Sequence, residues 1–416
     1  MRRHAATVLL LVASAGQALA DSPASLGQVA LLSRSYWLGT DGQQGAADRR
    51  EGAQGFLFNA ESAFTPGTLG VGLDVHAFAG FKLDGGRGHA GTGLLPQDSD
   101  GRSAAGYSSA GAALKLKLGA TQLQVGEMTV QTPVFDTADK RLRPEYASGA
   151  LLSSQPASGL QLQAGRFTAF SNQASSNSDD DFAGYGASTR HGGISLAGLS
   201  WAGPGTPYSA ALYAGQLDDT WRQLYANLGG SWGRWGLDGN AYRTRSTGAE
   251  QAGAIDTLAW SLAGSATLGS HRFTLAYQKV QGNTPFDFVG GDSIYLANSV
   301  KYADFNGPGE HSWQARYQWN GRALGLPGLA ASLRYVRGAG IDGSHAPAGG
   351  AYAGAQGADG RHWERDFDLG YTVQGGTFKG LALSLAQVSH RANAAQGGSA
   401  LDRLYLIIEY PWGASL

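Results

Sequence analysis

The 416-residue sequence contains no cysteine and only two methionines. Without cysteine the chain has neither disulfides nor thiolate metal sites, so a protein of this size must hold its fold by packing or by closing a sheet on itself. After residue 20 there is no apolar run of about 18 residues, which excludes a transmembrane helix. The formal net charge of −1 argues against a nucleic-acid partner.

The first twenty residues have the three parts of a secretory signal peptide. Arg2 and Arg3 precede an apolar run, and the run ends at small residues that form a cleavage site after Ala20. We expect residues 1–20 to be removed on export and residues 21–416 to form one mature domain. The apolar run is too short to serve as a membrane anchor.

Glycine and aromatic residues are abundant, with 64 glycines, 17 tyrosines, 15 phenylalanines and 10 tryptophans, while the mean hydropathy is slightly polar at −0.21. This combination favours alternating strands and glycine-rich turns. The segment HSWQARYQWN, residues 311–320, shows the alternation. Polar residues separate its apolar ones, which are Trp313, Ala315, Tyr317 and Trp319.

The same period of two, typical of a strand with two unlike faces, recurs along the chain. It is found in ALKLKL (113–118), GLQLQ (159–163), HRFTLAYQ (271–278), LAASLRYV (329–336), ERDFDLGYTV (364–373) and RLYLIIEY (403–410). One face of each segment is apolar and aromatic, which suits lipid flanked by aromatic girdles. The other face carries Lys, Arg and Asp, which need water. The pattern predicts an all-β transmembrane antiparallel up-and-down barrel.

Short turns alternate with long polar stretches between these segments. The long stretches are 84–108, 131–146, 172–192, 283–312 and 338–363. Short turns at one end and long loops at the other are typical of outer-membrane barrels. At roughly 22 residues for each strand with its connection, the mature chain holds about 16–18 strands. The alternative is a secreted β-sandwich or β-helix with one wetted face.

Several long strings resemble the OprD family of substrate-specific outer-membrane porins. They include EGAQGFLFNAESAFTPGTLGVGLDVHAFAGFKLDGG (51–86), GYSSAGAALKLKLGATQLQVGEM (106–128) and TPFDFVGGDSIYLANSVKYADFNGPGEHSWQARY (284–317). The similarity extends from about residue 26 to the C-terminus. It implies an 18-stranded monomeric barrel in the outer membrane of a Gram-negative bacterium, narrowed by long loops that fold inward.

The resemblance also implies facilitated diffusion of small water-soluble solutes, usually carboxylates such as amino acids, small peptides or organic acids, with carbapenem antibiotics in one branch. In the family a track of basic side chains on the pore wall guides the carboxylate, and acidic groups lie opposite. Several weak sites in series conduct better than one deep trap, and a narrow bore concentrates the field of its charges. The alternation predicts these wall residues: Lys115, Lys117, Arg316, Arg334, Asp366, Asp368 and Arg403, with Arg34 and Arg243 from less regular strands.

QTPVFDTADKRLRPEY, residues 131–146, falls where the resemblance places an inward-folded constriction loop. Pro133 and Pro144 stiffen it, and its charges of both signs suit an eyelet that grips an amine and a carboxylate together. The candidate residues are Arg141, Arg143 and Glu145, near Asp136, Asp139 and Lys140. A solvent-facing loop of mixed charge is the alternative.

LSLAQVSHRAN, residues 383–393, departs from the family pattern. Basic-substrate members carry an Arg-x-Arg pair where this chain has Ser384 and Ala386. Both positions face the lumen by alternation, so the basic track is interrupted, which argues against a simple preference for arginine-like solutes.

Catalytic motifs are absent from the sequence, since it has neither a G-x-S-x-G elbow nor an H-E-x-x-H helix. We therefore expect no enzymatic activity and no cofactor or metal. The expected partners are small solutes and outer-membrane lipid, and the expected state is a monomer. A non-selective general diffusion porin and a structural barrel without transport remain as alternatives.

Overall fold

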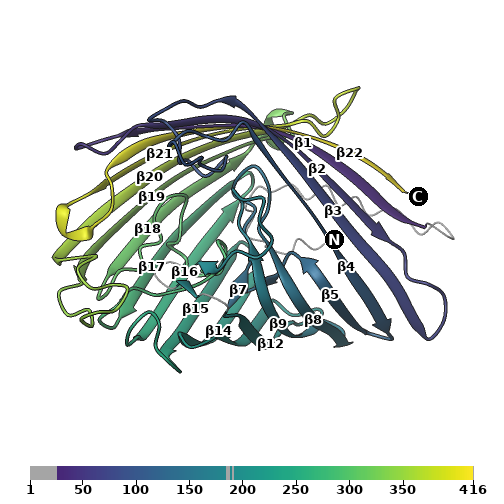
Figure 1. The fold of residues 1–416 in the computed structure, drawn as a ribbon, viewed down its shortest axis with the longest axis horizontal. Helices are drawn as coiled ribbons and strands as arrows, with labels where there is room; N and C mark the ends of the chain where they lie inside the picture. The colour runs from purple at the N-terminus through teal and green to yellow at the C-terminus, as the bar shows by residue number, and fades with distance from the viewer. Residues whose placement is uncertain (1–25, 184–187, 190–191, 416) are drawn as a thin grey trace.

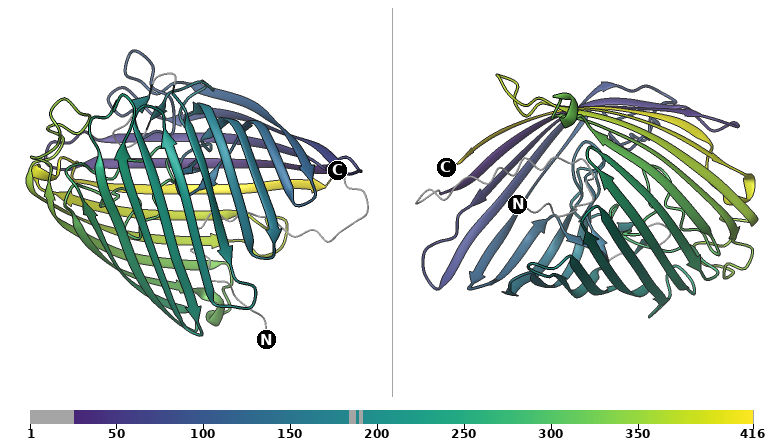
Figure 2. Two further views of the ribbon diagram at one scale, coloured as in Figure 1. Left: turned by 90° about the horizontal axis from the view of Figure 1, so that it is seen from below. Right: turned by 180° about the vertical axis from the view of Figure 1, so that it is seen from behind.

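The structure, a computed structural model, describes residues 26–183, 188–189 and 192–415, so the predicted signal peptide, residues 1–20, lies outside the described residues. Within this part of the chain, eighteen antiparallel strands form one sheet. The sheet closes because β1 (Gly27–Gly42) pairs with β22 (Leu401–Ser415) along its length. Figures 1 and 2 show purple β1 and yellow β22 side by side.

Each barrel strand pairs with its neighbours in the barrel, so the chain runs up and down around the wall. The intervening strands are β2 (Arg49–Ser62), β3 (Leu69–Asp84), β4 (Gly106–Leu118), β5 (Thr121–Met128), β8 (Tyr146–Ala157), β9 (Leu160–Ser171), β12 (Ile194–Ala202), β13 (Tyr208–Leu217), β14 (Trp221–Trp232), β15 (Trp235–Ser246), β16 (Asp256–Leu268), β17 (His271–Gln281), β18 (His311–Asn320), β19 (Leu329–Asp342), β20 (Ala358–Thr372) and β21 (Ala382–Ala392). Closure confirms the predicted barrel and excludes the sandwich and the β-helix.

The two ends of the barrel differ in the length of their connections. At one end, which we call the short-turn end, four pairs of strands are joined by two residues each: 119–120, 158–159, 233–234 and 269–270. At the other, the loop end, the longest connections are 85–105, 129–145, 172–193, 282–310 and 343–357. These lie within a few residues of the predicted long stretches. In outer-membrane barrels the long loops face outward and the short turns face the periplasm.

The outer face of the sheet is apolar and exposed. Leu275 is 70% exposed and Trp313 is 46% exposed, whereas Ser312 and Gln314, beside Trp313 in the sequence, are buried on the inner face. The predicted faces of residues 311–320 are confirmed. An exposed apolar face of this extent requires lipid around it. Among the described residues, no helix is long and apolar enough to cross a membrane.

Two loops fold inward and pack on the inner wall. The connection 129–145 contains a small hairpin of β6 (Gln131–Thr132) and β7 (Phe135–Asp136), and Figure 1 shows β7 within the ring of strands. Phe135 is fully buried in a cluster with Phe167 and Trp221 of the wall and with Phe286 of the loop 282–310. Each such aromatic side chain contributes about 1.5–3 kcal/mol on burial, so both loops are held inside the barrel.

A glycine lets the loop 129–145 approach the opposite wall. A Cβ atom on Gly55 of β2 would lie 3.0 Å from Cγ of Leu142. Leu142 is fully buried in a second cluster with Leu38, Tyr405 and Ala386. The loop therefore packs against two separate parts of the inner wall, as a constriction loop must.

Candidate functional site

Several cationic side chains of the inner wall lie on one row of directly paired residues. The row crosses seven adjacent strands from β2 to β18 in this order: Arg49, Thr40, Arg403, Val388, Asp366, Arg334 and Arg316. Direct partners on neighbouring strands point to the same face of a sheet. The prediction that Arg316, Arg334, Asp366 and Arg403 face the lumen agrees with this register.

The row runs obliquely down the barrel. Strands of a barrel tilt by about 35–45° from its axis and lie about 4.8 Å apart, so a row of partners descends by about 3 Å per strand. Its six steps therefore cover about 18 Å along the axis. Arg49 begins β2 at the loop end, whereas Arg316 lies four residues before the short-turn end of β18. The row thus leads from the outer mouth toward the periplasmic side.

Arg403 and Arg316 have no carboxylate within ion-pair distance among the described residues. Arg403 lies over the ring of Tyr302, 4.8 Å from its centroid, and its Nε donates to Oγ1 of Thr40 at 3.0 Å. Nε of Arg316 donates to Oγ of Ser332 at 3.1 Å. Both guanidinium groups keep donors that are free to bind an anion.

The acidic residues of the row neutralise part of it. Nε of Arg334 donates to Oδ2 of Asp366 at 2.8 Å, and Asp366 is fully buried. Asp368, two residues on, forms an ion pair of 3.0 Å with Nζ of Lys301 from the inward loop. Both carboxylates thus lie on the inner wall, each already paired with a cation.

The interruption expected on β21 is present. Asp368 pairs in register with Ala386, and Gly370 with Ser384, which places both residues of β21 on the inner face. Val388 is the buried member of the row on the same strand. An upper group of cations near Arg403 is therefore separated from a lower group near Arg316.

Arg34 fastens the constriction loop to the wall. Its side chain lies on the inner face of β1, is 4% exposed, and forms ion pairs with Asp139 at 2.6 Å and Glu409 at 2.7 Å. Its Nη1 also donates to the backbone oxygen of Arg141 at 2.9 Å. Arg34 lies on the inner face as expected, and protein groups satisfy its charge; its part in guiding solute stays a prediction.

Arg143 and Glu145 do not form an eyelet. Arg143 is fully buried, and its Nη2 donates to Oγ of Ser171 at 2.8 Å and to the backbone oxygen of Ser175 at 2.8 Å. Glu145 accepts from the backbone N–H of Gly291 at 2.9 Å and joins the two inward loops. Burial raises the pKa of Glu145. The prediction that these two residues line the passage is wrong, because partners on other loops bury them.

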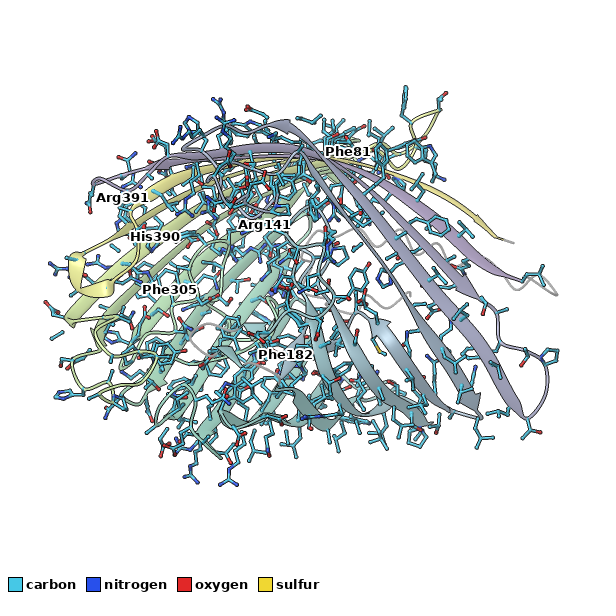
Figure 3. All side chains as sticks on the ribbon, viewed as in Figure 1. Phe81, Arg141, Phe182, Phe305, His390 and Arg391 are labelled. Carbon is cyan, nitrogen blue, oxygen red and sulfur yellow. The ribbon has the colours of Figure 1, made fainter. Side chains whose placement is uncertain are left out.

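Arg141 is the cation of this loop that remains available. Its Nε donates to the backbone oxygen of Thr92 at 3.2 Å, and within the described ranges no carboxylate forms an ion pair with it. Figure 3 shows Arg141 inside the barrel outline. Its neighbour Lys140 is paired with Asp292 at 2.5 Å. Burial raises the pKa of Asp136, which accepts a hydrogen bond from Tyr295, to about 7.

Lys115 and Lys117 lie on the inner face near the short-turn end. They pair in register with Gly72 and Gly70, and both ammonium groups lie over the ring of Phe64, at 5.3 and 5.4 Å from its centroid. Lys115 is buried and paired with Asp74, whereas Lys117 is exposed. Of these two lysines, Lys117 is therefore the available cation.

Arg243 does not face the lumen. It pairs in register with Leu224, which is 57% exposed on the outer face, and forms an ion pair with Asp256. The inner face of β15 is taken by Tyr242 and Thr244, both fully buried. The prediction that Arg243 lines the passage is wrong because the outer face of this strand is polar near the loop end, which hides the alternation.

Sequence reasoning missed several lumen cations, among them Arg49 of the row, Arg272 and Lys301. Arg272 pairs with Gln318 on the inner face, beside Arg316, and its Nη2 donates to Oγ of Ser265 at 3.1 Å. The signal was present, because Arg272 lies on the polar face of HRFTLAYQ. Lys301 lies on an irregular loop, where no periodicity assigns a face.

A buried chain of hydrogen bonds anchors the loop 282–310. Glu310 contacts Nε2 of His362 at 2.7 Å, and Nδ1 of His362 contacts Nε2 of His390 at 2.9 Å. Phe305 of the loop stacks on His362 with centroids 4.1 Å apart. Figure 3 shows Phe305 and His390 on this side of the barrel. The loop that carries Lys301 and Tyr302 is therefore fixed to the wall.

Comparison with known proteins places this geometry among the porins. Residues 26–414 match the family model described as outer membrane porin, OprD family. The chain is 42% identical to Porin D of Pseudomonas aeruginosa over 398 residues, covering 92% of this chain and 89% of that protein. It is 32% identical to the porin-like protein GalP of Pseudomonas putida over 410 residues, covering 95% and 94%.

A solved relative has the same fold. The crystal structure of Pseudomonas aeruginosa OpdK with vanillate superposes with a TM-score of 0.84 at 34% identity, covering 93% of this chain and 99% of that one. These relatives are outer-membrane channels and not enzymes. With a family model spanning the barrel and a close relative over nine-tenths of its length, the chain belongs to the OprD family of outer-membrane porins.

Proposed function

We propose that this porin is a selective channel for small solutes that bear a carboxylate, including amino acids, short peptides and organic acids. The observation that carries the proposal is the oblique row from Arg49 to Arg316, on which the guanidinium groups of Arg403 and Arg316 have no protein carboxylate. Lys117 and Arg272 add cations on the inner face, and Arg141 adds one on the constriction loop.

The chemistry of these groups suits a carboxylate. A guanidinium group binds a carboxylate through two parallel hydrogen bonds, and several moderate sites in series let the ion leave each one. The acids Asp366 and Asp368 lie in the gap between the two groups of cations, where each is paired with a protein cation, Arg334 or Lys301, and lowers the positive charge of the wall. A solved relative, OpdK, holds vanillate, an aromatic carboxylate, and the aromatic rings beside Arg403 suit such a solute.

The interruption at Ser384, Ala386 and Val388 lowers the positive charge midway along the wall. We therefore propose that the channel retains simple anions more weakly than an unbroken track of cations would. We also propose that zwitterions and carboxylate-bearing antibiotics such as carbapenems enter by the same route. We also propose a monomer, since the row lies within one barrel and needs no second chain.

Single-channel conductance in planar bilayers tests this function. The purified protein is studied with candidate carboxylates added to one side, and Arg316→Ala and Arg403→Ala are compared with wild type. Because each removed contact to a charged group is worth about 1.5–3 kcal/mol, we expect the time for which a carboxylate blocks the current to fall by about tenfold or more in each variant.

Arg322→Ala is the matched control, because Arg322 is an exposed arginine in a connection at the short-turn end. It should leave the blocking time unchanged. Large current steps that no solute interrupts would instead support a general diffusion porin. The absence of any conductance would support a structural barrel.

A further inference from the structure

Four arginines surround one tryptophan on the outer face near the loop end. Arg361 and Arg365 lie two residues before and after Trp363 on β20, and the register places Arg337 of β19 and Arg391 of β21 directly opposite Trp363. We call these five residues the arginine patch. Neighbouring strands are about 4.8 Å apart and residues on a strand about 3.3 Å, so the patch measures roughly 10 by 13 Å.

The patch lies at the border of the lipid-facing surface. Trp313 pairs in register with Arg337 and is 46% exposed, and Phe367, two residues beyond Arg365 toward the short-turn end, is 39% exposed. β20 begins at the loop end with Ala358, so the arginines lie beyond the apolar band on its outer side. This is the level of the headgroups of the outer leaflet. Figure 3 shows Arg391 beside His390 on the strand that ends there.

The positive charge of the patch is mostly uncompensated. Arg391 forms an ion pair of 2.7 Å with Asp402. Arg337, Arg361 and Arg365 are exposed and form no ion pair with any carboxylate in the described part of the chain; the side chain of Arg365 donates to Oγ of Ser389 at 3.3 Å. On other strands of the outer face Arg166 is paired with Asp218 and Arg243 with Asp256, while Arg222 of β14 is exposed and has no ion pair among the described residues.

We propose that the arginine patch binds the phosphate groups of a phosphorylated glycolipid in the outer leaflet of the membrane. Three guanidinium groups at this spacing present parallel donors to phosphate oxygens. The acyl chains of the same molecule would lie along Leu333 and Phe367, which are exposed on the face below. The ring of Trp363, with Arg391 at 5.9 Å from its centroid, offers a flat surface for a sugar. The site is independent of the passage proposed for the lumen, because it lies on the other face of the sheet.

Native mass spectrometry of the protein in detergent tests the proposal. The probe is an acylated glucosamine disaccharide with two phosphate groups, and the comparison lipid is the same molecule without phosphates. We expect wild type to bind the phosphorylated lipid at least tenfold more tightly than the comparison lipid. The triple variant R337Q/R361Q/R365Q should lose this preference.

A matched variant, R234Q/R322Q/K379Q, removes three exposed cations from connections at the short-turn end and should bind as wild type does. Competition by millimolar inorganic phosphate without any effect of the acyl chains would overturn the proposal, because a free anion would then suffice. Equal binding by the two triple variants would also overturn it. The proposal would also be overturned if R337Q/R361Q/R365Q lost self-association but kept lipid binding. The patch would then be a contact between copies of the chain. Unchanged conductance of both variants shows that they fold.

Discussion

Two uncharged residues, Val388 and Ala386, determine how the cations of the inner wall act on a passing anion. Both are buried on β21. Val388 lies between Arg403 and the Arg334–Asp366 pair, and Ala386 lies between Tyr405 and Asp368. Because neither side chain carries charge, an anion that leaves the upper group must cross a neutral and partly acidic stretch before it reaches Arg316. The electrostatic profile along the passage therefore depends on a single strand.

Ser384→Arg tests this account of the gap. Ser384 lies on the inner face and is only half-buried, so a longer side chain has space toward the lumen. We expect carboxylates to block the current for several times longer and anion selectivity to rise. Ser384→Gln, of similar length but without charge, is the control, and an equal effect of both substitutions would contradict an electrostatic origin.

Asp136 gives the constriction loop a dependence on pH. Burial raises its pKa from 3.8 to about 7, so the folded protein holds the proton more tightly than the unfolded chain does. This contribution to the free energy of unfolding is present at low pH and is lost as pH rises from about 4 to about 7. Glu145, whose pKa is also raised, acts in the same direction.

We therefore expect the urea midpoint of wild type to fall between about pH 4 and about pH 7, and the fall to be smaller in Asp136→Asn. Asp100→Asn is the control, since Asp100 is an exposed carboxylate of the connection 85–105. A fall of the same size in wild type and Asp136→Asn would show that another group controls the pH dependence.

The loop 129–145 depends on the clasp formed by Arg34, Asp139 and Glu409. Removing one partner of a buried ion pair leaves the other charge unpaired and costs about 3–5 kcal/mol. We expect Arg34→Ala to loosen the loop, which should raise the single-channel conductance and its noise. Lys82→Ala is the control, because Lys82 is a lumen-facing lysine that contacts a different loop through Ser103, and it should leave conductance and noise unchanged. Unchanged conductance and noise in Arg34→Ala would contradict this role of the ion pairs.

Elements with a regular period could be predicted from the sequence, and irregular ones could not. In a strand such as residues 311–320 the face of each side chain is set by its neighbours in the chain, so Arg316 and Trp313 were placed correctly. Arg143 and Glu145 were misplaced because their partners, Ser175 and Gly291, come from other loops. Arg243 was misplaced because the band of polar residues at the membrane border disturbs the alternation.

The barrel as a whole depends on the pairing of its first and last strands. β1 and β22 pair along fifteen residues of β22, and without β22 both β1 and β21 would present open edges to lipid, where unpaired backbone groups are costly. We expect truncation after residue 400 to abolish the heat-modifiable shift in gel mobility that folded barrels show. A folded, membrane-inserted truncation product would contradict this dependence.

The oblique row of cations has a geometric consequence for the solute. The row crosses six of the eighteen intervals between strands, so a solute that follows it turns through a third of a circle while it descends. A screw-shaped path is chiral. Mirror-image amino acids, gripped by the same carboxylate, would turn their side chains toward different parts of the wall, and the two enantiomers should block the current for different times.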